Sequence, residues 1–325
     1  MPIVIANPSI AQLATWVATY NGQVNKIYSL DTDATTWQEG TGTVQDNGRF
    51  SASDGTQWYT SGNSAASDTI NLQQSDDGIT FVTQNVQGNV GASLADHAAY
   101  TTFGGGVWIM TNTTDIIRST DGGANWSAIA GHASFGNVAK GIAHDGAGNW
   151  AICATNGMIQ YSADNGLTWS YGSTTGINYD WEGITYNTND SLFYISNYNT
   201  SASFGGIYTS NDGGATAVRV YTTVNRPMDI SANDSGVIMA SKIAGGIVRK
   251  TAGGTWSEFT IPGHTSFQVS AGKGAAEGTW VSVGGTNGAE IAVSTDDGDN
   301  WSVMADPVGS HASDLISVGY LNYYA

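Results

Sequence analysis

The sequence predicts an all-β protein built from seven repeated four-stranded units, and three observations lead to this fold class. The chain is rich in residues typical of turns and strands, with 43 glycines, 11 tryptophans and 15 tyrosines among 325 residues. A turn-like segment ending in an aromatic residue recurs along the chain. Short runs of alternating apolar and polar residues lie between its copies. Since a single core rarely grows beyond about 250–300 residues, the length also favours a repeat architecture.

The recurring segment is clearest as STDGGANW at 119, SADNGLTW at 162 and STDDGDNW at 294, with looser copies at 74 and 210. Two further copies differ in length. SLDTDATTW at 29 has one residue more, and KTAGGTW at 250 has one fewer, with Ala252 in place of the acid. The start-to-start spacings are 45, 45, 43, 48, 40 and 44 residues. Seven units of this length span nearly the whole chain.

Each unit has room for four strands. Runs such as VWIMTN, LFYISN and EIAVS are bounded by Gly, Asn and Asp, which is typical of half-buried antiparallel strands. A second aromatic series lies upstream of the turns, at Trp16, Trp58, Trp108, Trp150, Phe193 and Trp280. Radial repetition of such units predicts a seven-bladed β-propeller, one domain over residues 1–325. The units are expected at about 1–44, 45–90, 91–133, 134–178, 179–223, 224–262 and 263–309. Residues 310–325 are expected to add the innermost strand of the first blade, which closes the ring.

The repeated turns are predicted to join the third and fourth strands of each blade and to be structural. The acid can accept hydrogen bonds from its own turn, a glycine two residues later can take a positive φ, and the aromatic ring can enter the core. These positions are Asp31, Asp76, Asp121, Asp164, Asp212 and Asp296 for the acid, and Trp37, Phe81, Trp126, Trp169, Trp256 and Trp301 for the ring. A calcium loop is the alternative at 296–300 and 31–33, but neither has the twelve-residue spacing that ends in Glu.

The S-x-D-x-G-x-T-W pattern resembles the Asp-box, or BNR, repeat of sialidases, family 74 glycoside hydrolases, sortilin-type receptors and photosystem II assembly factors. Seven copies across the chain imply the propeller fold. They do not imply one function, because the repeat occurs in enzymes, receptors and assembly factors alike. A sialidase would present three clamping arginines and a Tyr–Glu pair, which the five arginines here do not match. Photosystem assembly factors present an arginine-rich surface that this chain lacks.

Charge and composition exclude several functions. The net charge is −17 with only ten Lys and Arg residues, which disfavours nucleic acid and anionic membranes as partners. A single cysteine, Cys153, excludes an internal disulfide and a thiolate metal cluster, and it is expected to be a buried apolar residue. No cofactor, metal or catalytic residue is assigned. The N-terminal residues do not resemble a Sec signal peptide.

A ligand site is expected on the face opposite the repeated turns, where one blade leads into the next, as in Asp-box enzymes. Trp181 is the one tryptophan outside both aromatic series, and it is flanked by Tyr179, Asp180 and Glu182. Aromatic rings beside carboxylates suit a sugar ligand. The alternative is that Trp181 is an additional packing residue between blades. The candidate set adds Arg226, Asp229 and His132. Four histidines (His97, His132, His264 and His311) lie in these connections; loop capping is favoured over metal binding.

The function expected from these residues is that of a non-catalytic, surface-exposed binding or structural propeller. An acidic chain with abundant Ser, Thr, Asn and Gly and no signal peptide fits a bacteriophage virion component, such as a tail, fibre or decoration protein. Its partners would be virion proteins, a second copy of the chain or a host-surface glycan, and its location the virion or extracellular surface. The alternative is a glycoside hydrolase that uses Asp180 or Glu182 with Asp229 as its carboxylate pair.

Overall fold

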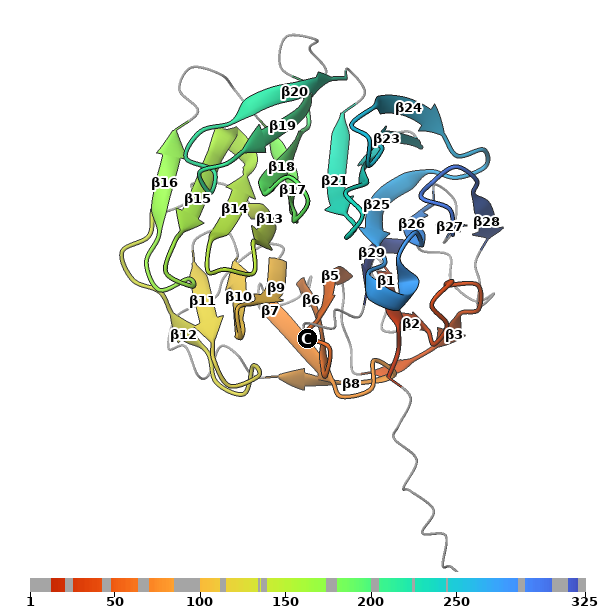
Figure 1. The fold of residues 1–325 in the computed structure, drawn as a ribbon. Helices are drawn as coiled ribbons and strands as arrows, with labels where there is room; N and C mark the ends of the chain where they lie inside the picture. Colours follow the sequence, from red (N-terminus) through yellow and green to blue (C-terminus); the bar gives the residue numbers. More distant parts are fainter. Residues whose placement is uncertain are drawn as a thin grey trace, which may run out of the picture.

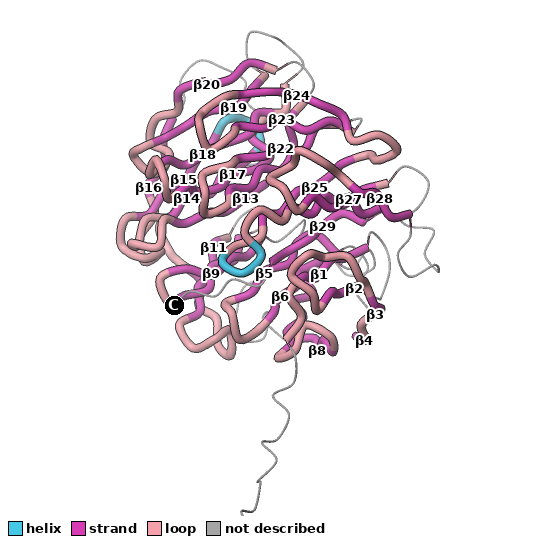
Figure 2. Tube along the Cα trace, turned by 45° about the vertical axis from the view of Figure 1, so that its right-hand side comes forward, coloured by secondary structure: helices cyan, strands magenta, loops and turns pink. Residues whose placement is uncertain are grey.

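The computed structural model describes most of the chain. The described residues are 13–20, 26–42, 48–63, 70–84, 100–111, 115–133, 135, 139–173, 180–199, 205–223, 226–243, 245–285, 290–305 and 315–320. They form seven sheets of four antiparallel strands arranged in a ring, one of which carries a fifth, parallel strand, and this confirms the predicted all-β, seven-bladed propeller (Figure 1). The only helical segments among them are two 3-10 turns, η1 (Thr155–Gly157) and η2 (Gly274–Ala276), coloured cyan in Figure 2. No helix of the described chain is long and apolar enough to cross a membrane.

The first four blades are built from strands in chain order, apart from one strand that the C-terminal region contributes. Blade 1 contains β29 (Leu315–Tyr320), β1 (Trp16–Tyr20), β2 (Lys26–Ser29) and β3 (Gln38–Glu39). Blade 2 contains β5 (Gly48–Ser53), β6 (Trp58–Asn63), β7 (Ile70–Ser75) and β8 (Thr80–Gln84), and the short β4 (Thr41–Gly42) pairs in parallel with β8. Blade 3 contains β9 (Tyr100–Gly104), β10 (Val107–Thr111), β11 (Ile116–Ser119) and β12 (Ser127–Ala128). Blade 4 contains β13 (Ala139–His144), β14 (Trp150–Ala154), β15 (Met158–Ser162) and β16 (Ser170–Ser173).

The remaining three blades follow the same plan. Blade 5 contains β17 (Trp181–Asn187), β18 (Leu192–Asn197), β19 (Gly206–Ser210) and β20 (Val218–Thr222). Blade 6 contains β21 (Pro227–Ala232), β22 (Ile238–Lys242), β23 (Gly246–Lys250) and β24 (Trp256–Thr260). Blade 7 contains β25 (Ser266–Ala271), β26 (Trp280–Gly284), β27 (Glu290–Ser294) and β28 (Ser302–Ala305).

The ring closes through the C-terminal strand, as predicted. β29 pairs with β1, with Trp16 opposite Tyr320 and Ala18 opposite Val318. The seven innermost strands β29, β5, β9, β13, β17, β21 and β25 contact one another in that cyclic order. They approach closely, because a Cβ on Gly319 of β29 would lie 2.3 Å from the carbonyl oxygen of Ser51 in β5. The inner strands therefore form a packed wall around a central channel.

The repeated turns between third and fourth strands share one hydrogen-bonding scheme. In the turn at 119, Ser119 Oγ donates to the Asp121 carboxylate (2.8 Å), which accepts the Asn125 N–H (2.9 Å). Gly123 takes a φ of 82°, and a Cβ there would lie 2.1 Å from the Tyr59 hydroxyl oxygen. The same bonds recur in the turns at 162, 210 and 294. These hydrogen bonds hold the carboxyl pKa of Asp121 below its usual range, with the bonds from Asn125 the largest cause.

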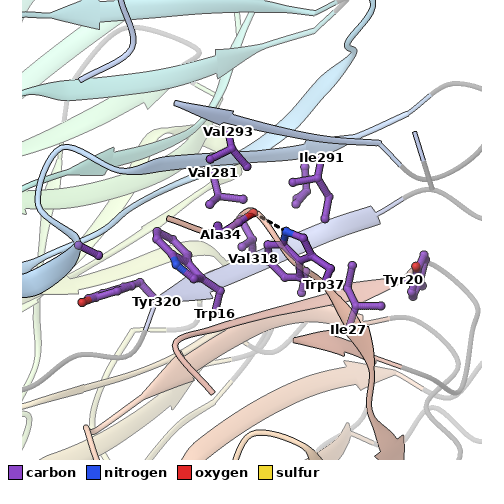
Figure 3. Close-up of a cluster of buried hydrophobic side chains, with 13 residues drawn as sticks. Trp16, Tyr20, Ile27, Ala34, Trp37, Val281, Ile291, Val293, Val318 and Tyr320 are labelled. Atoms are coloured by element: carbon purple, nitrogen blue, oxygen red, sulfur yellow. Dashed lines mark hydrogen bonds between the residues drawn. The ribbon is translucent and has the colours of Figure 1, made fainter. Parts of the chain in front are cut away.

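The tryptophan of the turn packs into the core and donates its indole N–H to its own turn. Trp126 donates to the Gly123 carbonyl (2.9 Å), and in blade 1 Trp37 donates to the Ala34 carbonyl (2.8 Å), the bond drawn in Figure 3. Trp37 joins a cluster that contains strands of blades 1 and 7, so the ring seals one blade against the next. The second aromatic series is buried throughout, with Trp16, Trp58, Trp108, Trp150, Phe193 and Trp280 at most 3% exposed.

Two copies of the turn differ from the prediction. In blade 2 the carboxylate that closes the turn is that of Asp77, not of Asp76, because Asp77 lies two residues after Ser75 and accepts the N–H groups of Ile79 and Thr80 (2.8 Å each). In blade 6, where the acid is missing, Thr251 Oγ1 accepts the N–H of Thr255 instead (3.1 Å). Trp256 is then only half-buried and stacks on Tyr221, with ring centroids 5.0 Å apart.

Candidate site at the mouth of the central channel

A cavity of about 210 Å³ occupies the central channel, and residues of all seven innermost strands line it. Strand direction alternates within each blade, so the repeated turns lie on one face and the connections between blades on the other. We call these the turn face and the inter-blade face. Each innermost strand starts at the inter-blade face. Channel residues at the start and the end of these strands therefore belong to opposite mouths.

Most innermost strands are bulged where they start. Register shifts occur between Gly48 and Phe50 in β5, and in β13, β17, β21 and β25 at the equivalent places. A β-bulge disrupts the ladder locally and redirects a side chain. In β13 and β17 the bulged residues are Lys140 and Glu182, and in β21 the bulge spans Met228 and Asp229. The bulges thus place charged side chains at the mouth on the inter-blade face.

Asp229 lines the channel and is half-buried. Its carboxylate accepts the backbone N–H of Val269 from the next blade (3.2 Å), and its own N–H donates to Ser241 Oγ (3.2 Å). Burial raises the pKa of Asp229 to about 7, although hydrogen bonds from the backbone of Val269 and Ile230 oppose this rise. The side chain is therefore a carboxyl group that exchanges its proton near neutral pH.

Lys140 and Glu182 form an ion pair between blades 4 and 5, with 3.0 Å between Nζ and Oε2. Both side chains are largely buried, at 26% and 15% exposed. Burial raises the pKa of Glu182, and the ammonium of Lys140 limits the rise. Residues of both signs consequently lie at this mouth; Glu182 was predicted as a site residue, whereas its partner Lys140 was not.

Arg226 and Asp180 come together on the inter-blade face through Tyr198, which was not among the predicted site residues. Arg226 Nη1 donates to the Tyr198 hydroxyl (2.9 Å), and the guanidinium lies over the Tyr198 ring, 4.8 Å from its centroid. The Tyr198 N–H donates to the carbonyl of Asp180 (2.7 Å). The Asp180 side chain itself is exposed. Arginine, tyrosine and aspartate from two neighbouring blades thus share one surface.

Trp181 has no role as a sugar platform, because its ring is fully buried at 0% exposed. It packs edge-on against Tyr208, with centroids 5.0 Å apart, in a cluster with Cys153 and Ile195. The alternative interpretation, an additional packing tryptophan between blades, describes it. Tyr179 lies outside the described residues. Cys153 is fully buried in the same cluster, as expected.

The described histidines of the inter-blade connections have local partners. His132 Nδ1 lies 3.0 Å from the carbonyl of Ala133. His264 is buried, with Nε2 3.0 Å from Ser282 Oγ and Nδ1 3.4 Å from a Glu290 carboxylate oxygen. His97 and His311 lie outside the described residues. Among those described, no group of three or more His, Cys, Asp or Glu side chains is placed to hold a metal.

Ser282, His264 and Glu290 contact one another in the same order as the nucleophile, base and acid of a hydrolytic triad. Ser282 is 0% exposed and His264 5% exposed, however, and neither lines the channel cavity. Burial lowers the pKa of His264 to about 4, so the imidazole is neutral at physiological pH. A substrate has no access to this serine. The trio holds the blade 7 connection in place.

The opposite mouth, on the turn face, has a different composition. His144 ends β13, Tyr186 lies near the end of β17, and Tyr320 ends β29 and donates its hydroxyl to the carbonyl of Lys273 (2.6 Å). Burial, together with the charge of Lys273, lowers the pKa of His144 to about 4. These residues could not be predicted from the sequence, since nothing in their spacing distinguishes them from other strand ends.

Comparisons with known proteins identify the fold. No protein-family model matches the sequence, and no curated protein matches it. Among solved structures, YCF48 bound to a D1 peptide is 14% identical with a TM-score of 0.60 over 94% of this chain and 95% of that one. A streptogramin B lyase is 14% identical, with a TM-score of 0.62 over 84% and 86%. Virginiamycin B lyase from Staphylococcus aureus with quinupristin is 13% identical, with a TM-score of 0.61 over 89% and 95%. At identities this low, the similarity establishes a shared propeller fold alone. One of these neighbours was solved with a bound peptide, and others are lyases.

Proposed function

We propose that the protein is a non-catalytic binding propeller whose inter-blade face, around the channel mouth, holds a segment of a protein partner. The observation that carries this proposal is the mouth itself, where Lys140, Glu182 and Asp229 come from three consecutive inner strands. The cavity behind it, about 210 Å³, is smaller than the roughly 300–1,000 Å³ of pockets that enclose a small molecule. A chain end or a side chain of a larger partner fits such a space.

The comparison with YCF48 supports a protein partner, because that propeller was solved with a D1 peptide bound. The buried position of Trp181 weighs against a host-surface glycan, since the aromatic face that would stack on a sugar is inside the core. The buried position of Ser282 and His264, neither of which lines the channel cavity, weighs against hydrolysis by this serine triad.

The setting we propose is a multi-protein assembly, specifically a bacteriophage virion in which the chain is a tail, fibre or decoration component at the virion or extracellular surface. Support comes from a net charge of −17 and a composition rich in Ser, Thr, Asn and Gly. The hydrogen bonds of Asp121 and its counterparts support placing the chain among Asp-box propellers. Protein partners would then be other virion proteins or further copies of the chain.

A glycoside hydrolase is the second candidate, and one observation favours it. Asp229, whose pKa is about 7, has the property of a general acid, and Glu182 lies on the neighbouring inner strand. Glu182 is engaged by Lys140, which opposes its use as a nucleophile. Turnover of an aryl-glycoside or polysaccharide panel, abolished in Asp229→Asn and retained in Asp180→Asn, would establish this activity in place of the binding function.

Site-specific photo-crosslinking tests the binding function. A photoreactive amino acid is placed at Asp180, exposed on the inter-blade face, or at Leu167, 56% exposed in a repeated turn on the other face. Each protein is irradiated in extracts or particles from the source culture, and products are identified by mass spectrometry. We expect one partner protein from position 180 and none from position 167. Equal crosslinking from both positions, or from 167 alone, would contradict the proposal.

A further inference from the structure

Arg226 has a backbone conformation that is unusual for a residue other than glycine. Five described non-glycine residues have a positive φ. Ala34, Asn165 and Asp297 lie in repeated turns and Ser191 in the β17–β18 hairpin, where the chain must reverse. Arg226, with a φ of 45°, lies in the connection that enters β21 on the inter-blade face. A positive φ at a residue other than glycine is a form of backbone strain that clusters at active sites and ligand clamps.

Two neighbouring segments hold Arg226 in this conformation. Its carbonyl accepts the N–H of Ile243 (3.3 Å), which fixes the backbone from the β22–β23 hairpin. Its guanidinium rests on the Tyr198 ring and donates to the Tyr198 hydroxyl (2.9 Å). Stacking and a hydrogen bond together select one orientation of a side chain that otherwise has many. The guanidinium is therefore positioned before any ligand arrives.

The charge of Arg226 is not neutralised by any carboxylate within the part of the chain that the structure describes. The acids outnumber the bases in this protein, 27 to 10, and five of the other described cations have acidic partners. These partners are Glu182 for Lys140, Glu258 for Lys242, Asp299 for Arg249, Asp190 for Lys250 and Asp234 for Lys273. Arg226 instead bonds a neutral phenol through one of its five N–H groups.

We propose that Arg226 anchors a carboxylate of the polypeptide that binds the inter-blade face. A guanidinium presents paired N–H groups that match the two oxygens of a carboxylate, and a stacked guanidinium loses little freedom when it binds one. The carboxylate belongs to an Asp or Glu side chain or to a chain end. This inference rests on the proposed peptide-binding function and adds the chemistry of the ligand to it.

Fluorescent octapeptides with matched sequences provide the test. One set carries Glu or Gln at a single central position with an amidated C-terminus, and a second set carries no acid and has a free or amidated C-terminus. Binding is measured by fluorescence anisotropy. We expect wild-type protein to bind carboxylate-bearing peptides at least tenfold more tightly than their amide counterparts. The set that shows this difference identifies the source as a side chain or a chain end.

Three variants connect the preference to Arg226. Arg226→Gln is expected to remove the tenfold preference, whereas Arg219→Gln, at an exposed arginine on β20, is expected to keep it. Arg226→Gly is expected to bind as weakly as Arg226→Gln while its Tm exceeds that of Arg226→Gln by about 1–3 °C, because both variants lose the guanidinium and only glycine adopts a positive φ without strain. The same loss of binding in two variants of different stability shows that the loss does not come from unfolding.

The results that overturn the inference differ from those that overturn the proposed function. Equal binding of Glu and Gln peptides, with free and amidated ends also equal, would leave peptide binding intact and remove the role of Arg226. An unchanged preference in Arg226→Gln would do the same. If no peptide bound wild-type protein, both proposals would fail. Binding of a uronic acid oligosaccharide in place of peptides, lost in Arg226→Gln, would overturn the polypeptide as the source of the carboxylate.

Discussion

Replacing Asp229 with asparagine should stabilise the protein at alkaline pH and leave it almost unchanged in acid. Asp229 lies in the channel wall, and burial raises its pKa from 3.8 to about 7. Its carboxylate accepts the N–H of Val269 (3.2 Å), a bond that the carbonyl oxygen of an asparagine also accepts. The substitution therefore keeps the shape and the hydrogen bond and removes the charge.

The sign and size of the effect follow from proton linkage. Because the pKa is higher in the folded than in the unfolded protein, the folded protein binds more protons between pH 3.8 and about 7. Stability contributed by protonated Asp229 is fully present below pH 3.8 and is lost as the pH rises through about 7. At about 1.36 kcal/mol per pKa unit, the loss reaches about 4 kcal/mol at pH 8. Asp229→Asn should recover most of that amount.

Urea unfolding of both proteins at pH 4 and pH 8 measures this difference. We expect the free energy of unfolding of Asp229→Asn to exceed that of wild type by about 2–4 kcal/mol at pH 8 and by less than about 1 kcal/mol at pH 4. Asp180→Asn, an exposed carboxylate of the same face, serves as the control and should change neither value by more than about 0.5 kcal/mol. The same stabilisation at both pH values, or a less stable Asp229→Asn at pH 8, would refute the reasoning.

Three further predictions concern parts of the fold away from Asp229. Asp77→Ala should lower the free energy of unfolding by about 1–3 kcal/mol, because three hydrogen bonds of its turn lose their acceptor. Asp76→Ala should lower it by less than about 0.5 kcal/mol. Thermal melts compare the two variants, and a less stable Asp76→Ala would contradict the assignment. Trp181→Ala should cost about 3–5 kcal/mol as a cavity in the core, and an unchanged melting temperature would show that the ring is not packed there. Burial lowers the pKa of His264 from 6.5 to about 4 in the folded protein. The neutral His264 therefore contributes to the free energy of unfolding above pH 6.5, and this contribution disappears as the pH falls through 4. Wild type should therefore lose about 3 kcal/mol relative to His264→Gln between pH 7.5 and pH 4 in urea titrations, and a constant difference would exclude this linkage.

The fold could be predicted because each blade repeats one hydrogen-bonded turn. Ser119, Asp121, Gly123 and Trp126 depend on one another within eight residues, so the pattern is local and survives in the sequence. The prediction failed where local alternatives compete. Two adjacent acids follow Ser75, and only the three-dimensional turn shows that the second one accepts the backbone N–H groups.

The candidate site was predicted less well, because its residues meet across blades. Glu182 was identified from its neighbours in the sequence, but its partner Lys140 lies 42 residues earlier on another inner strand. Tyr198 has no sequence feature that connects it with Arg226. Trp181 was misleading for a physical reason: its place outside the repeat reflects packing at the start of β17 rather than exposure to a ligand.

The pairing of β29 with β1 has a consequence for how the chain is made. Synthesis produces β29 about 300 residues after β1, so the edge of β1 that β29 covers stays open until β29 has been made. A chain that lacks β29 exposes that edge, where it can pair with other chains. The closing strand thus makes the stability of blade 1 depend on a segment far away in the sequence. We expect loss of the last few residues of β29 to be more damaging than a nick of the same length in a surface loop.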